Sequence, residues 1–363
     1  MSQKKYRFAL VGCGRIVKKH VDAINSIKEA ELVAVCDIKR EKAEMIGKQY
    51  HVPFYESYDD MLKKEDIDIV NILTPSGLHP EHTVDIVKKY KKHIVCEKPM
   101  ALTLEDADNM IETCDEYGCR LFIVKQNRYN LPVQKLREAV ETGLLGKIIL
   151  GTVRVRWCRE QKYYDQDSWR GTWALDGGVI TNQASHHIDL LEWMMGEPVS
   201  VIGKTATYLA NIEADDTAIA IITFKNGAMG LIEATTAARP KDLEGSISIL
   251  GHKGTIVIGG FAVNKMVTWN VADQSKEEQE RILKEYAEEP PNVYGFGHVR
   301  YLENVIDCIK NNKKALVDGI EGRRSLELIN AIYESAETGK EVFLRFQPKR
   351  AKLGRKNEKH KNI

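Results

Sequence analysis

Two groups of polar residues have the types and spacing that proton transfer requires. Glu97-Lys98-Pro99 follows an apolar run, and a lysine at the end of a buried strand is rarely without a partner. A desolvated Lys98 would take part in proton transfer or polarise a hydroxyl oxygen, whereas a surface Glu–Lys pair is the structural alternative. The second group, Asn182, His186 and Asp189, lies in a predicted helix, in which residues three and four apart share one face. This places an amide and a carboxylate beside His186, a general base for an alcohol proton.

A glycine turn near the N-terminus has the pattern of a phosphate-binding site. Gly12 permits a tight turn, and Gly14 lets the backbone approach a pyrophosphate at the start of the next helix, beside Arg15 and Ile16. The third glycine of the full fingerprint is replaced by Val17, so the motif by itself is weak evidence.

Asp37 at the end of the second predicted strand strengthens the case for a dinucleotide. A carboxylate there holds the ribose hydroxyls and repels a 2′-phosphate, which favours NAD over NADP. Lys39 and Arg40 follow it, so NADP stays open. A cap of the next helix is the structural alternative for Asp37.

Arginine, tyrosine and tryptophan are concentrated between residues 154 and 173. Such side chains bind phosphates through paired hydrogen bonds and stack on planar bases, which favours a nucleotide sugar or an acidic sugar as substrate. Cation–π packing at a strand edge is the structural alternative.

The elements that must position these residues form two domains, as expected for 363 residues. Up to residue 127, near-continuous Val/Ile runs alternate with helical segments, which predicts a doubly wound parallel sheet, a Rossmann domain. The predicted strands are 6–11, 32–37, 67–75, 93–99 and 120–124; the predicted helices include 39–49, 79–90 and 103–117.

From residue 128 to 346 the pattern changes to an α+β domain with a large, mainly antiparallel sheet. TAIAIITF and SISIL alternate polar with apolar residues, and KNGAMG and LGHKGTIVIGG are hairpin signals. Helices are expected at 132–142, 295–312 and 319–338. Residues 347–363 are predicted to be a basic, flexible tail.

Composition excludes several classes of protein. No run of apolar residues is long enough to cross a membrane, and the seven cysteines form no CxxC pair. We therefore expect a cytoplasmic protein without a metal site. The basic tail has no interleaved aromatic residues, so nucleic-acid binding is not expected.

The chain resembles the glucose–fructose oxidoreductase/inositol dehydrogenase (Gfo/Idh/MocA) family over residues 5–346. VGCGRI, TPSGLHPEHT, VCEKPMALT, GGVITNQASHHIDLLEWMMG and ADDTAIAIITFKNGAMG are similar to that family's motifs and follow the same order. The resemblance implies that Lys98 and His186 line the active site. Many members carry an aspartate where this chain has Asn182, which leaves the base to His186 or Lys98.

Further segments, QNRYN, RVRWCREQKYYD, SWRGTWALDGG and EATTAARPKDLEG, are similar to the subgroup that oxidises UDP-N-acetyl-glucosaminuronate (UDP-GlcNAcA) at C3. This resemblance implies NAD as cofactor, a partner aminotransferase in a pathway to 2,3-diamino-uronates and surface polysaccharide, and a homo-oligomer, a dimer or homotetramer, formed through the open sheet face. The implied substrate side consists of Arg128, Tyr163, Tyr164, Trp169, Arg170, Asn182, Gln183 and Arg239. The implied cofactor side adds Thr74, Ser76, His79, Glu97, Lys98 and Gln126 to the glycine turn and Asp37.

The sequence thus predicts an NAD-dependent UDP-sugar 3-dehydrogenase. The alternatives are another NAD-dependent sugar or polyol dehydrogenase, an NAD-dependent glycosidase, and a non-catalytic NAD-binding sensor. Lys98 and His186 favour the enzymes over the sensor.

Overall fold

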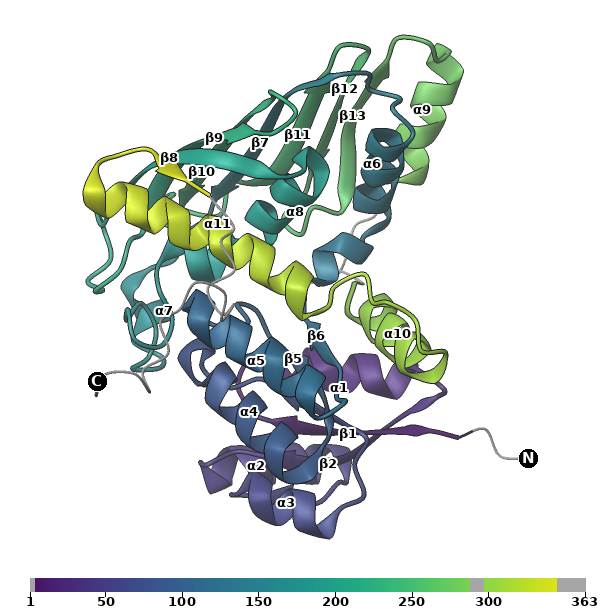
Figure 1. The fold of residues 1–363 in the computed structure, drawn as a ribbon, viewed down its shortest axis with the longest axis vertical. Coiled ribbons are helices and arrows are strands. Elements are labelled where there is room, and N and C mark those ends of the chain that lie inside the picture. The colour runs from purple at the N-terminus through teal and green to yellow at the C-terminus, as the bar shows by residue number, and fades with distance from the viewer. Residues whose placement is uncertain (1–3, 288–296, 345–363) are drawn as a thin grey trace, which may run out of the picture.

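A computed structural model describes residues 4–287 and 297–344 of the chain. Figure 1 shows two domains, a smaller one built on the strands nearest the N-terminus and a larger one dominated by a wide sheet. The predicted tail at 347–363 lies outside the described residues. Within those residues, no helix has both the length and the apolar character needed to span a bilayer.

The first domain contains the predicted parallel sheet. Its strand order is β3-β2-β1-β4-β5-β6: from β1 the chain adds β2 and β3 on one side and then β4, β5 and β6 on the other. Ligands bind at the switch point between β1 and β4 in sheets of this kind. The strands are β1 (Tyr6–Val11), β2 (Ala30–Cys36), β3 (Phe54–Tyr55), β4 (Ile69–Ile72), β5 (His93–Cys96) and β6 (Leu121–Ile123). The helices are α1 (Val17–Ser26), α2 (Arg40–Tyr50), α3 (Tyr58–Lys64), α4 (His79–Tyr90) and α5 (Leu104–Glu116), with a 3-10 turn η1 (Ser76–Leu78). The Rossmann prediction is confirmed.

The second domain contains an eight-stranded sheet in the order β13-β12-β11-β7-β10-β9-β8-β14. Only β7 and β10 pair in parallel, and the other neighbours are antiparallel, so this prediction is also confirmed. The strands are β7 (Ile148–Arg156), β8 (Pro198–Ala206), β9 (Thr217–Phe224), β10 (Met229–Thr235), β11 (Glu244–Gly251), β12 (Gly254–Gly259), β13 (Lys265–Val271) and β14 (Val342–Phe343).

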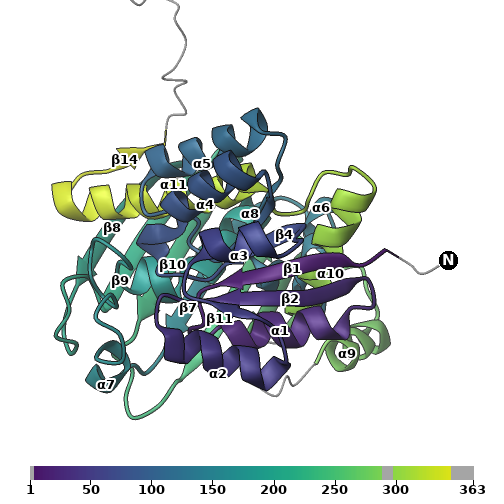
Figure 2. The same ribbon diagram turned by 90° about the horizontal axis from the view of Figure 1, so that it is seen from below.

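Helices cover one face of this sheet and leave the other open (Figure 1). Figure 2, seen from below, shows the first domain in front of this sheet. The covering helices are α6 (Leu131–Glu141), α8 (Ser185–Met195), α9 (Lys276–Glu285) and α11 (Gly319–Thr338); α7 (Gln161–Tyr164), η2 (Gln126–Tyr129) and η3 (Val179–Gln183) are short turns. Strand β9 shows the consequence, because its residues alternate between buried and exposed. Ile202, Ile219, Ile221 and Met229 are exposed on the open face.

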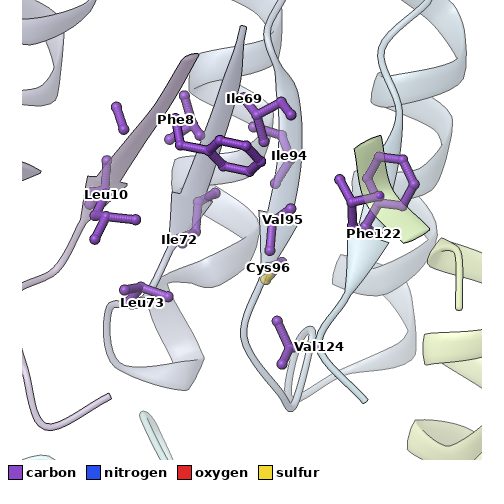
Figure 3. Close-up of a cluster of buried hydrophobic side chains, with 14 of the residues drawn as sticks. Phe8, Leu10, Ile69, Ile72, Leu73, Ile94, Val95, Cys96, Phe122 and Val124 are labelled. Atoms are coloured by element: carbon purple, nitrogen blue, oxygen red, sulfur yellow. The ribbon is translucent and has the colours of Figure 1, made fainter. Parts of the chain in front are cut away.

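The core of the first domain is built from the apolar runs that the sequence suggested. Figure 3 shows Phe8 and Leu10 of β1, Ile69 and Ile72 of β4 and Ile94 of β5 in one cluster of buried side chains. Phe8 is in register with Ile69 on one face of the sheet, whereas Ile72 and Ile94 point to the other face. Each of these side chains is fully buried, which stabilises the fold by about 1.5–3 kcal/mol apiece.

Helix α10 (Gly297–Lys310) returns from the second domain to the first. It packs against α1, and Tyr301, Leu302, Val305 and Ile306 join the same hydrophobic core as β1 and β4. Helix α10 therefore adds to the core of the first domain, although it lies far beyond residue 127, where the sequence predicts the domain boundary.

Candidate active site

The glycine turn lies at the switch point between β1 and β4. Gly12 has φ +104°, and a Cβ there would lie 2.7 Å from the carbonyl carbon and oxygen of Leu73, so only glycine fits. A Cβ on Gly14 would meet nothing within 4 Å. The N–H groups of Gly14, Arg15 and Ile16 have no backbone acceptor in the described part of the chain, and the ten-residue helix α1 follows them. This open set of donors suits a pyrophosphate.

Asp37 joins the end of β2 to this turn. Its Oδ2 accepts the N–H of Cys13 at 2.8 Å, and its Oδ1 accepts that of Lys39 at 2.8 Å. The alternative role as the cap of α2 is wrong, because the N-cap residue is Lys39 and no side chain caps that helix. Each oxygen of Asp37 keeps a second lone pair, so the ribose hydroxyls of NAD fit against it.

His79 holds the loops after β4 and β5 together. Its Nδ1 lies 2.8 Å from the carbonyl oxygen of Pro99, and its Nε2 lies 2.8 Å from that of Thr74. The Thr74 hydroxyl lies 3.0 Å from Nδ1 of His82, and Ser76 is buried. Because both nitrogens of His79 are engaged and its ring is buried, this residue positions the cofactor-side loops.

Lys98 reaches from the end of β5 to the second domain. Its ammonium donates to the backbone carbonyl oxygen of Asn182 at 2.6 Å. Glu97 points elsewhere: its Oε2 accepts the N–H of Lys98 at 3.0 Å, and its Oε1 lies 3.0 Å from Nε2 of His20. Burial lowers the pKa of Lys98, and the carboxylates of Glu97 and Asp176 partly oppose that shift.

His186 is the second titratable group of the site. Its Nε2 lies 3.2 Å from Nε2 of Gln126, and its Nδ1 has no partner among the described residues. Burial lowers the pKa of His186 well below its usual value, and the ammonium groups of Lys98 and Lys125 lower it further. The imidazole is therefore neutral and keeps a lone pair that can accept an alcohol proton, while the neighbouring ammonium groups make it a weaker base.

The segment before α8 is not the α-helix that the sequence predicted. Val179–Gln183 form a π-helical turn, and α8 starts at Ser185. In an α-helix the carbonyl of Asn182 would accept the N–H of His186, whereas here it accepts the ammonium of Lys98. The prediction that Asn182 and His186 share one helix face is therefore wrong. Turns of this kind occur frequently at functional sites.

Asp189 and Arg128 form a buried pair away from His186. The two carboxylate oxygens of Asp189 accept Nε–H and Nη2–H of Arg128, each at 2.8 Å, and Nη1 of Arg128 donates to Glu321 at 2.9 Å. Arg128 is only 2% exposed. Its guanidinium is therefore occupied in joining η2 to α8 and α11, so we leave Arg128 out of the substrate side and Asp189 out of the proton path.

The basic aromatic segment gathers around one tyrosine. The guanidinium carbons of Arg15, Arg159 and Arg170 lie 5.5, 5.5 and 4.8 Å from the centre of the Tyr163 ring. The Tyr163 hydroxyl accepts hydrogen bonds from Arg170 and from Nε2 of Gln183, both at 2.9 Å. Three arginines around one ring form a positive surface that suits a diphosphate or a carboxylate. We call these four residues the arginine–tyrosine cluster.

The other predicted substrate residues lie at different depths. Trp169 packs against Arg170 at the edge of the cluster, with the guanidinium carbon 4.6 Å from the centre of the Trp169 ring. Arg239 is exposed and donates to the carbonyl oxygen of Arg159 at 3.2 Å. Tyr164 is buried and bonds within its own domain.

Two arginines of the same segment lie outside the site. Arg154 and Arg156 are on the open face of the sheet, where Arg156 pairs with Glu233 at 2.5 Å and both approach Glu244. The strand alternation of β7 accounts for this, because Val153 and Val155 point into the core.

Sequence reasoning missed Asp176, and it included Arg159 in the basic aromatic segment without assigning it to the substrate side. Arg159 was only one of several arginines in a dense segment, and Asp176 precedes two glycines, as many turn aspartates do. The structure brings both next to predicted residues: Asp176 accepts a hydrogen bond from Asn182, and Arg159 donates to Gln183 at 3.3 Å.

One group of potential metal ligands occurs in the described residues. Ligand atoms of His20, Glu97 and His298 lie within 4.8 Å of one another, inside the core of the first domain. His20 already lies within hydrogen-bond distance of Glu97 and Asn71, so its two nitrogens are engaged. The prediction that the chain binds no metal stays a prediction.

Comparison with solved structures gives close matches over nearly the whole chain. The WlbA dehydrogenase from Bordetella pertussis, solved in complex with NADH and UDP-GlcNAcA, is 43% identical, with a TM-score of 0.89 over 96% of this chain and 100% of that one. The WlbA dehydrogenase from Chromobacterium violaceum, also with NADH and UDP-GlcNAcA, is 40% identical, with a TM-score of 0.88 over 96% and 98%.

Curated relatives and family comparisons agree with these matches. The myo-inositol 2-dehydrogenase of Thermotoga maritima is 28% identical over 345 residues, 93% of this chain and 98% of the relative. Residues 6–125 match the oxidoreductase family NAD-binding Rossmann fold, and residues 137–344 match the oxidoreductase family C-terminal alpha/beta domain. The glycine turn and Asp37 fit the cofactor, which is NAD. With both family domains in order, the chain belongs to the Gfo/Idh/MocA family of oxidoreductases.

Proposed function

We propose that this NAD-dependent sugar dehydrogenase oxidises the C3 hydroxyl of UDP-GlcNAcA to the 3-keto sugar. The two WlbA structures support this substrate, since both hold NADH and UDP-GlcNAcA and are at least 40% identical to this chain. The observation on the chain itself that carries the proposal is the arginine–tyrosine cluster, which is connected to the candidate catalytic residues.

The connection runs through Gln183 and Asn182. Nε2 of Gln183 donates both to the Tyr163 hydroxyl and to Oδ1 of Asn182, at 2.9 and 2.5 Å. The next contact along this path is the bond between Asn182 and Lys98. A substrate whose anionic groups lie on the arginines would therefore extend its sugar ring toward Lys98.

UDP-GlcNAcA has the charge that such a surface selects. Its diphosphate and its carboxylate are both anionic, and a guanidinium binds either through two parallel hydrogen bonds. We assign Arg159 and Arg170 to these groups, with Trp169 and Tyr163 as flat surfaces beside them. Arg15 belongs to the glycine turn as well, so it lies between the cofactor and substrate sides.

The oxidation removes a hydride and a proton from the substrate, and different groups accept them. NAD, when bound on the glycine turn, supplies the acceptor for the hydride that leaves C3. His186 accepts the hydroxyl proton, because its buried imidazole is held neutral. Lys98 donates a hydrogen bond to the hydroxyl oxygen and stabilises the negative charge that develops there.

We propose the same cellular role that the resemblance implied. The 3-keto product would pass to a partner aminotransferase in the cytoplasm, on a route to 2,3-diamino-uronates and surface polysaccharide. The open sheet face favours a dimer or homotetramer, because Ile202, Ile219, Ile221 and Met229 expose apolar surface that self-association would cover.

The function is tested by following NADH formation with UDP-GlcNAcA and with UDP-GlcNAc, which lacks the carboxylate. We expect NADH only with the acidic sugar. We also expect Lys98→Ala and His186→Ala each to lower kcat by about 100-fold or more, whereas Lys253→Ala, an exposed lysine, serves as the matched control. NADH formed equally well from both sugars would contradict the proposed specificity. Cleavage of a nitrophenyl glycoside at a comparable rate would favour a glycosidase.

A further inference from the structure

Asp176 is a buried carboxylate for which the proposed reaction has no role so far. It lies in the loop before η3 and is 2% exposed. Its Oδ2 accepts the N–H of Gly171 at 2.8 Å, and its Oδ1 accepts a hydrogen bond from Nδ2 of Asn182. Both partners are donors, and this is the arrangement that an ionised carboxylate requires.

Asn182 connects Asp176 to Lys98. The amide is held at both ends, because its Nδ2 donates to Asp176 while its Oδ1 accepts from Gln183 at 2.5 Å. The backbone carbonyl of the same residue accepts the ammonium of Lys98 at 2.6 Å. The carboxylate therefore fixes the π-helical turn that receives the lysine.

Asp176 also acts on Lys98 through its charge. The charged groups that act most strongly on Lys98 are the carboxylates of Glu97 and Asp176 and the cations of Lys125 and Arg170. The imidazole of His186, whose pKa burial and Lys98 lower, is a further titratable group beside it. Both oxygens of Glu97 already interact, with His20 and with the backbone N–H of Lys98. Asp176 is thus the second negative charge that favours the ammonium form against burial and two neighbouring cations.

We propose that Asp176 is a positioning residue of the catalytic site, which fixes Asn182 and holds Lys98 as an ammonium aimed at the substrate hydroxyl. It supplies the negative charge that position 182, an amide in this chain, does not carry. The identity of the hydroxyl rests on the proposed function, whereas the orientation and charge of Lys98 do not.

The test uses the full-length enzyme with Asp176→Asn, which keeps the size of the side chain but removes its charge. The matched control is Asp165→Asn, the same change at an exposed residue of the neighbouring segment. We expect Asp176→Asn to bind NADH like the wild type and to keep KM within about threefold while kcat falls about tenfold or more. The alkaline limb of the kcat profile, where Lys98 loses its proton, should move to lower pH by about one unit or more, because a favourable charge is lost.

A second measurement does not depend on the sugar. The rate at which an acylating reagent modifies Lys98, followed by peptide mass spectrometry across a pH series, reports the titration of this lysine directly. In Asp176→Asn the labelling curve should shift to lower pH by the same amount as the alkaline limb. If the wild type fails to oxidise UDP-GlcNAcA, the proposed function is lost, yet the labelling series still decides the role of Asp176.

Moving the charge separates a positioning role from a merely structural one. The double variant Asp176→Asn/Asn182→Asp exchanges the two groups across the same hydrogen bond. We expect it to return the alkaline limb and the labelling curve toward the wild-type positions. A folded Asp176→Asn enzyme with an unmoved labelling curve would overturn the inference, as would a double variant that folds and binds NADH but shows no recovery.

Discussion

The two glycines of the NAD turn should respond to alanine in opposite ways, because one is required by the fold and the other by the cofactor. At Gly12 an added Cβ would lie 2.7 Å from the carbonyl of Leu73 at a φ of +104°. A left-handed backbone costs about 1–3 kcal/mol for a non-glycine residue, and relieving an overpacked contact costs a similar amount. We therefore expect Gly12→Ala to lose about 2–6 kcal/mol of stability, a large share of the total free energy of unfolding of a globular protein, which is about 5–15 kcal/mol.

Gly14→Ala should leave folding intact. Its Cβ would meet no atom within 4 Å, so the free energy of unfolding should stay constant or rise by about 0.4–1 kcal/mol. The same methyl group would stand where the pyrophosphate approaches, and we expect the Kd for NADH to rise about tenfold or more, equivalent to about 1.4 kcal/mol.

Thermal unfolding with and without NADH, together with fluorescence titration of NADH, separates the two effects. Gly12→Ala should unfold at a clearly lower temperature even without cofactor, whereas Gly14→Ala should lose mainly the stabilisation that NADH provides. Normal NADH affinity in Gly14→Ala would refute the assignment of the pyrophosphate to this turn. Unchanged stability in Gly12→Ala would refute the steric reasoning.

Three further outcomes are expected from changes elsewhere in the chain. Arg128→Met removes both hydrogen bonds to the buried carboxylate of Asp189 and leaves only Lys125, at 3.8 Å, to pair with it, so it should cost about 3–5 kcal/mol in urea denaturation; a loss below about 1 kcal/mol would show that the pair is not structural. Burial lowers the pKa of His187 to about 4, so the unfolded chain takes up this proton first as the pH falls. The free energy of unfolding should then decrease from about pH 6.5 toward pH 4, by up to about 1.4 kcal/mol per unit, and His187→Phe should reduce that slope if the assignment is right. Ile221→Asp puts a charge on the open sheet face and should lower the mass measured by light scattering, whereas Asn226→Asp in the adjoining turn should not.

The Rossmann half was readily predicted because its strands are buried on both faces. Tyr6–Val11 and His79–Tyr90 appear in the structure with the predicted bounds, since a continuous apolar run and a helical period are both local signals. Phe54–Tyr55 and Tyr58–Lys64 were missed, because a two-residue strand and a two-turn helix are too short to show a period.

The candidate active site was only partly predictable, because spacing shows which residues share a face of a helix and not which residues of other elements lie opposite them. Lys98 could be found, since it follows a strand at the edge where such sheets bind ligands. The partner of Asp189 could not, because Arg128 lies 61 positions earlier and packs against it only in the folded chain. Asn182 was misassigned for a different reason: a π-helical turn inserts one extra residue, and no residue type signals that shift.

The return of α10 to the first domain has a consequence for how the chain is made. While the ribosome synthesises the protein, the NAD-binding sheet emerges long before Tyr301, Leu302 and Val305, which belong to the same core. The nascent domain therefore exposes the apolar surface of α1 until translation is nearly complete. A chain cut short before residue 297 carries every predicted NAD-contacting residue and still lacks part of the core beneath them, so chaperones and proteases can distinguish it from the finished enzyme.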